Sequence, residues 1–137
     1  MAILFYIICK ENQCISFLID GQSKIASLQK TKEVEEALIR LGALSEIVRV
    51  RESRKVRAGK GKSRGRKMKQ SVGPLIVVAE NKGIIEAASN IPGVDAVSVT
   101  NLNAEMLAPG THPGRLIVWT SGAIEKLGNL YGQGGRD

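Results

Sequence analysis

The chain has 137 residues, of which 43% are apolar and 24% charged, and its net charge is +7. This length is typical of one globular domain with a sizeable core. The longest apolar run, residues 2–9, is far shorter than the roughly 20 residues of a membrane span, so we expect no membrane partner. One histidine and two cysteines cannot build a four-ligand zinc site from Cys and His alone. We therefore expect no metal and no other cofactor.

Two apolar runs open the chain, at residues 2–9 and 14–19, and they predict two short buried strands. Asp20-Gly21 is a turn signal after the second run, and residues 22–29 are expected to be a loop. Two thiols, Cys9 and Cys14, are a weak case for a secreted disulfide framework. We therefore expect both to be reduced and the protein to be intracellular.

A helix is predicted over residues 32–41, because apolar residues recur there every three or four positions. Thr31 is its expected N-cap, and Gly42 its C-terminal stop. Residues 45–51 contain Ile47, Val48 and Val50, which predicts a short strand leading into a basic segment.

The second half of the chain continues the alternation. Residues 75–79 are continuously apolar and mostly β-branched, as in a central strand covered on both faces. The pattern then predicts a helix over 81–90 that starts at Asn81, followed by a strand over 94–100. A short helix over 104–107, capped by Asn103, comes next. A strand over 115–120 and a helix over 121–130, capped by Ser121, complete the pattern. Residues 132–137 are expected to be a disordered tail.

Alternating strands and helices predict the α/β class, with a mostly parallel, Rossmann-like sheet of about four to five strands and helices on both faces. We find no internal repeat and expect a single domain over residues 1–131, with a basic loop inserted at 52–72.

The basic segment, residues 49–69, contains eleven Lys or Arg and one acid, Glu52, and so carries +10. The whole chain carries +7, so the other 116 residues together carry −3. Repulsion between these charges disfavours a compact segment unless a bound anion neutralises them. The segment contains no aromatic residue that could stack on bases. We therefore expect a glycine-punctuated loop that contacts phosphates and orders on RNA; RNA is favoured over DNA because no recognition helix carries the charge.

Other interpretations of the same residues are weaker. Gly59-Lys60-Gly61-Lys62-Ser63 has the ending of a nucleotide-binding phosphate loop, but the motif needs glycine where Val56 stands. Asp20 and Glu80 follow apolar strands, yet no cysteine or histidine near them in sequence completes a catalytic constellation. A nucleotide-binding hydrolase and a general nucleic-acid-binding protein remain alternatives to a structural RNA-binding protein, for which we expect no catalytic residues and no small-molecule substrate.

Several separate segments resemble the archaeal and eukaryotic form of the large-subunit ribosomal protein four family, over about residues 15–130. The resemblance rests on Lys30-Thr-Lys-Glu-Val34, Val56-Arg-Ala-Gly-Lys-Gly-Lys-Ser-Arg-Gly-Arg-Lys-Met-Lys69, Pro74-Leu-Ile-Val-Val78, Gly93-Val-Asp-Ala-Val97, Asn101-Leu-Asn-Ala-Glu-Met-Leu-Ala-Pro-Gly110, His112-Pro-Gly-Arg-Leu-Ile-Val-Trp-Thr120 and Ser121-Gly-Ala-Ile-Glu-Lys-Leu127.

This resemblance implies a three-layer α/β/α sandwich in the large ribosomal subunit of the cytoplasmic ribosome, bound to large-subunit RNA and to neighbouring ribosomal proteins. The family's N-terminal half, with its tunnel-lining extension, has no counterpart in the matched segments, so we expect an N-terminally truncated form. The expected RNA-binding residues are Arg49, Arg51, Arg54, Lys55, Arg57, Gly59, Lys60, Gly61, Lys62, Arg64, Gly65, Arg66, Lys67 and Lys69.

Overall fold

The computed structural model describes the backbone of residues 5–8 and 15–19 and all atoms of residues 25–112 and 114–132. The expectations for Cys9, Cys14, Asp20 and the tail beyond residue 132 lie outside these ranges. The strands are β1 (Phe5–Ile8), β2 (Ile15–Ile19), β3 (Lys55–Val56), β4 (Met68–Lys69), β5 (Leu75–Val78), β6 (Asp95–Ser98) and β7 (Ile117–Thr120). The helices are α2 (Thr31–Arg40), α3 (Leu44–Ser53), α4 (Ile84–Ser89), α5 (Ala104–Leu107) and α6 (Ser121–Tyr131), with 3-10 turns η1 (Lys60–Lys62), η2 (Val99–Asn101) and η3 (Pro109–Thr111).

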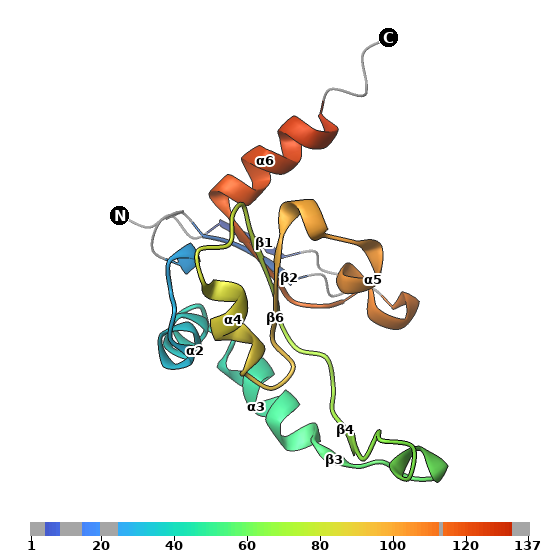
Figure 1. The fold of residues 1–137 in the computed structure, drawn as a ribbon. Coiled ribbons are helices and arrows are strands. Elements are labelled where there is room, and N and C mark those ends of the chain that lie inside the picture. Colours follow the sequence, from blue (N-terminus) through green and yellow to red (C-terminus); the bar gives the residue numbers. More distant parts are fainter. Residues whose placement is uncertain (1–4, 9–14, 20–24, 113, 133–137) are drawn as a thin grey trace.

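A sheet with the strand order β1-β2-β7-β5-β6 forms the centre of the molecule (Figure 1). Strand β5 pairs in parallel with β6 on one side and with β7 on the other. Strand β2 is parallel to β7, and β1 is antiparallel to β2. The predicted α/β class and the parallel pairing are confirmed, while a complete three-layer sandwich of four to five strands stays a prediction.

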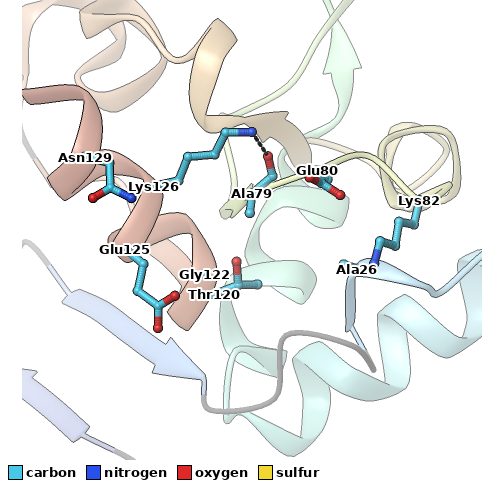
Figure 2. Close-up of a pocket in the computed structure, with 9 residues that line it drawn as sticks. All are labelled: Ala26, Ala79, Glu80, Lys82, Thr120, Gly122, Glu125, Lys126 and Asn129. Atoms are coloured by element: carbon cyan, nitrogen blue, oxygen red, sulfur yellow. Dashed lines mark hydrogen bonds between the residues drawn. The ribbon is translucent and has the colours of Figure 1, made fainter.

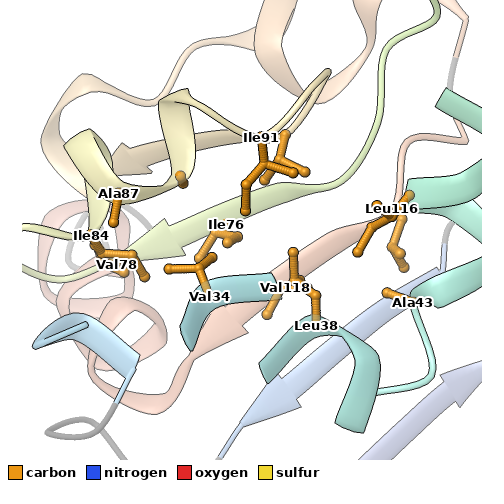
Figure 3. Packing of buried hydrophobic residues seen from close by; sticks show 13 residues of the cluster. Val34, Leu38, Ala43, Ile76, Val78, Ile84, Ala87, Ile91, Leu116 and Val118 are labelled. Carbon is orange, nitrogen blue, oxygen red and sulfur yellow. The ribbon is translucent and has the colours of Figure 1, made fainter. Parts of the chain in front are cut away.

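Side chains of the parallel strands alternate between two hydrophobic clusters. On one face, Ile76, Val78 and Val118 pack with residues of α2, α3 and α4 (Figure 3). On the other face, Leu75 and Val77 pack with residues of β6 and with Ala123 of α6 and partly buried side chains of α5. All four residues of β5 are buried, because a strand with parallel neighbours and helices on both faces has no solvent side.

Residues 45–51 are not a strand. They lie in α3, whose buried residues are Ile47 and Val50, three positions apart and so on one side of a helix. The β-branched residues of this segment favour a strand locally, but that preference is weak and packing overrides it. Val50 is fully buried, and its methyl groups lie against the backbone of Gly73 and Gly93.

Other boundaries differ by a few residues. Ile25 and Ala26 are helical where a loop was expected, and the strand predicted over 94–100 ends at Ser98 and continues as η2. Asn81 does not begin the helix: its Oδ1 accepts a hydrogen bond from Gly83 N at 2.9 Å, and α4 starts after this turn. Thr31 and Ser121 are the first helical residues of α2 and α6 and not their caps, since the N-caps are Lys30 and Thr120, neither with a side-chain cap hydrogen bond.

Two end signals are confirmed. Asn103 caps α5 by accepting from Met106 N at 2.8 Å, and Gly42 follows α2 with φ of +80°.

Among the described residues, no helix has the length and apolarity needed to cross a bilayer.

Candidate nucleic-acid interface

Residues 49–53 of the basic segment lie in α3, and the rest, residues 54–69, forms a two-stranded hairpin beyond the end of this helix, which we call the basic hairpin (Figure 1). In β3 and β4, Lys55 lies opposite Lys69 and Val56 opposite Met68. The ladder continues with a 2.9 Å hydrogen bond from Arg57 N to Lys67 O, and η1 forms the tip. The basic loop expected over residues 52–72 is not irregular throughout, because residues 55–56 and 68–69 are paired strands and residues 60–62 form a 3-10 turn.

Two glycines at the tip have backbone angles that other residues rarely adopt. Gly59 has φ of +77° and Gly65 has φ of +80°, and a Cβ added to either would meet no atom within 4 Å. Gly61 serves a different purpose: a Cβ there would lie 2.8 Å from Cδ of Arg57. The Arg57 side chain packs across Gly61 and donates from Nε to Arg66 O at 3.2 Å, which ties the two legs of the tip together.

The root of the hairpin is held by side chains that the sequence analysis did not single out. Ser71 N donates to the Ser53 hydroxyl at 2.8 Å, so the C-terminal end of α3 is bonded to the returning leg. Gly73 N donates to Gly93 O at 2.9 Å, and Gly73 O accepts from Nε of Arg115 at 2.9 Å. Ser71 and Gly73 of the returning leg are thus fixed to the body of the domain.

Arg115 is the buried cation of this root. Its side chain is 4% exposed, and besides Gly73 O it donates from Nη1 to Met106 O at 2.8 Å and from Nη2 to the Asp95 carboxylate. It therefore connects the beginnings of β5, β6 and β7 to α5. A single arginine ahead of an apolar strand carries no pattern that separates it from the surface arginines, so no local signal predicts this role.

The eleven predicted RNA-binding cations fall into two groups. Arg49 donates from Nη2 to Glu46 at 2.6 Å and to Val72 O at 3.1 Å, and Arg51 donates to Glu35 at 2.9 Å. These two cations lie on α3 and form ion pairs with carboxylates within the fold. Among the residues that the structure describes, no carboxylate lies within ion-pair distance of the remaining nine, which we call the hairpin cations: Arg54, Lys55, Arg57, Lys60, Lys62, Arg64, Arg66, Lys67 and Lys69.

Comparison with known families identifies the group to which this fold and hairpin belong. A sequence model of the family described as "Ribosomal protein L4/L1 family" matches residues 8–130, which is most of the chain. The chain belongs to the ribosomal protein L4/L1 family. This membership confirms the resemblance drawn from the basic segment and the sequences that follow it.

Three relatives within the L4/L1 family carry the name "Large ribosomal subunit protein uL4". The relative from Methanosphaera stadtmanae is 50% identical over 121 residues, covering 88% of this chain and 46% of its own. Those from Candida albicans and Archaeoglobus fulgidus are 47% and 46% identical, over 80% and 77% of this chain and 30% and 42% of their own. The chain thus spans less than half the length of these relatives.

The phosphate-loop interpretation of Gly59-Lys60-Gly61-Lys62-Ser63 does not fit this L4/L1 structure. A nucleotide-binding loop connects a buried strand to the N-terminus of a helix. Here the five residues form the exposed tip between β3 and β4, and the Ser63 hydroxyl donates to Lys60 O at 2.8 Å.

The strand-end acid Glu80 lies in a crevice of about 350 Å³ at the carboxyl ends of β5 and β7 (Figure 2). The charged residues that line it are Glu80, Glu125, Lys82 and Lys126, and Lys126 Nζ donates to Ala79 O at 3.0 Å. The two acids balance the two lysines, so the crevice has no bias toward an anion. Its described lining includes neither cysteine nor histidine, and no described group of three or more His, Cys, Asp or Glu residues could hold a metal ion.

Proposed function

We propose that this chain is a structural constituent of the large ribosomal subunit and binds large-subunit RNA through the basic hairpin. The observation that carries the proposal is the presentation of nine cations without described carboxylate partners on one projecting hairpin. Family membership and the names of the relatives support the same assignment.

The hairpin is suited to phosphates more than to base edges. Its cations surround a ribbon that contains no aromatic residue, so it has no platform for base stacking by aromatic rings. Neutralising phosphates releases counterions, and this gives binding that depends strongly on salt. Gly59 and Gly65 leave open space at the tip, where an RNA backbone can approach closely.

The proposal includes roles for the remaining predicted residues. Arg49 and Arg51 hold α3 and the root of the hairpin through contacts within the fold, and Gly61 admits the side chain of Arg57, which ties the tip together. Residues 1–131 would form one domain, completed as a three-layer α/β/α sandwich. Within a cytoplasmic ribosome, its partners would be large-subunit RNA and neighbouring ribosomal proteins.

Salt-dependent RNA binding tests the proposal. The probe is a transcript of the large-subunit ribosomal RNA of Methanosphaera stadtmanae. If about six phosphates are contacted, affinity falls roughly 10³-fold between 50 and 200 mM salt. The protein should prefer this transcript over bulk duplex DNA; affinity insensitive to salt, or equal affinity for duplex DNA, would contradict the ribosomal assignment.

The hydrolase alternative has its own measurement. Nucleotide turnover by the purified chain that disappears in Lys62→Ala would favour an enzyme. We expect no turnover above background in either protein, because the tip lacks the helix N-terminus that holds phosphates in such enzymes.

A further inference from the structure

An exposed apolar pair lies in the middle of the basic hairpin. Val56 and Met68 are directly opposite each other in β3 and β4. They are 54% and 40% exposed, respectively. Opposed residues of an antiparallel ladder point to the same face, so the two side chains form one patch, while the next pair, Lys55 and Lys69, points to the other face.

Nothing within the described part of the fold covers this patch. Neither Val56 nor Met68 belongs to a core cluster, and β3 and β4 form a two-stranded sheet of their own. A hairpin of this kind gains little from leaving two large apolar side chains in water. Polar β-branched residues would serve an unpartnered ribbon equally well.

The charges around the patch restrict what can cover it. The ribbon that carries the patch is cationic throughout: Lys55 and Arg57 flank Val56, and Lys67 and Lys69 flank Met68 along the strands. Their long side chains leave from the opposite face, but the ribbon is only two strands wide, so a partner that covers the patch also meets these charges at its edges. A partner that buries the patch must therefore be strongly anionic and also offer an apolar surface. RNA meets both requirements where the face of a base is unstacked, since within a paired helix the stacking of neighbouring base pairs covers these faces.

We infer that Val56 and Met68 together form the contact site for one unpaired nucleobase of the bound RNA. The inference rests on the proposed function and deepens it by naming the class of RNA: a folded RNA with an unstacked base close to a phosphate cluster. The Met68 thioether makes favourable contacts with aromatic rings, and Val56 adds a rigid β-branched surface beside it. The hairpin cations hold the backbone, and the apolar pair selects the place along it.

The test is the double variant Val56→Thr with Met68→Thr. Threonine is β-branched and keeps the strand preference of both positions, but its hydroxyl disfavours a dry contact with a base. We expect the affinity for the Methanosphaera stadtmanae ribosomal RNA transcript to fall about tenfold, in line with the loss of partly buried apolar surface. The slope of log affinity against log salt should not change, because no phosphate contact is removed.

Two controls keep the outcome specific. Val48→Thr changes a valine of similar exposure, 41%, on the outer side of α3 and should leave the affinity unchanged. A fully paired 20-bp RNA duplex should bind the wild type and the double variant equally. Met68→Phe should bind the transcript more tightly than the wild type, since an aromatic ring stacks on a base better than a thioether does.

Each other outcome overturns the inference. Unchanged affinity of the double variant for the transcript, with salt dependence intact, overturns it and leaves the proposed function standing. A parallel loss of duplex affinity or of salt slope in the double variant would show that the pair supports the hairpin itself and contacts no base. A wild type without salt-dependent binding to the transcript removes the proposed function and this inference with it.

Discussion

Ser71 N donates a 2.8 Å hydrogen bond to the hydroxyl oxygen of Ser53, eighteen residues earlier in the chain. The same hydroxyl donates to Val50 O at 2.6 Å in the last turn of α3. One serine thus joins both legs of the hairpin, because it accepts from the returning leg and donates to the helix that leads outward. The direction of the hairpin is set by α3 through this contact.

Replacement of that hydroxyl should loosen the root. Ser53→Ala removes two partly buried hydrogen bonds, so we expect a loss of about 1–2 kcal/mol in the free energy of unfolding and faster amide exchange at Ser71. Ser63→Ala is a matched control, since Ser63 also donates to a carbonyl three residues earlier but accepts no hydrogen bond from a distant segment within the described part of the chain. Denaturant unfolding and hydrogen exchange measure both; equal losses in the two variants would contradict the root assignment.

Substitution of Arg115, which lies close to the surface, should be among those that lower the free energy of unfolding most. Arg115→Ala leaves Gly73 O and Met106 O without their donor, and we expect a loss of about 2–4 kcal/mol. Arg115→Lys should recover only part of this, because an ammonium group cannot match the fork geometry of a guanidinium. Asp95 is 59% exposed, so Asp95→Asn should cost much less than Arg115→Ala. If Asp95→Asn cost as much as Arg115→Ala in thermal unfolding, the ion pair and not the backbone contacts would hold the root.

Alanine substitutions at Gly93 and Gly110, which have almost the same φ, distinguish the cost of backbone strain from the cost of a steric clash. Gly93 has φ of +73° and Gly110 has φ of +71°, but a Cβ added to Gly93 would collide with Val50 Cγ1 while one at Gly110 meets nothing within 4 Å. Gly110→Ala should cost about 1 kcal/mol, from the backbone alone. Gly93→Ala should cost about 1–3 kcal/mol more, because the core must shift. Chemical denaturation of the two variants checks the difference, and equal losses would exclude close packing of Val50 on Gly93.

The division of the basic residues predicts unequal effects on RNA binding. Arg64→Gln with Arg66→Gln removes two hairpin cations and should reduce the salt slope by about 2. Arg49→Gln with Arg51→Gln removes the same number of arginines, but these are already paired with Glu46 and Glu35, so the slope should barely change. Affinities measured from 50 to 200 mM salt give both slopes. An equal reduction in both double variants would place α3 in direct contact with phosphates.

Much of the central sheet could be predicted from the sequence. The run Leu75–Val78 is apolar at every position and mostly β-branched, which is typical of a strand with both faces covered. The helix at α2 was predictable because Val34 and Leu38 recur at helical spacing, and Asn103 was predictable as a cap because its side chain bonds within three residues. These features depend on local spacing and on groups close together in the chain.

The sequence also located the basic segment, but not its form. Charge is a property of composition, so the excess of cations over residues 49–69 is visible without any fold. Which cations remain available for a partner depends on contacts between distant segments. Arg51 is paired with Glu35, sixteen residues away, and Arg49 reaches Val72 O, twenty-three residues away.

By itself, then, the sequence determined the class of the fold, the position of its central strand and the place where positive charge concentrates. Only the tertiary structure decided that residues 44–53 are helical, because the burial of Val50 against Gly73 and Gly93 outweighs its local preference for a strand. The tertiary structure also decided that residues 54–69 of the basic segment form a hairpin, whose root Ser53 and Arg115 hold. Those contacts join residues far apart in the chain, and no local pattern records which partner a side chain meets after folding.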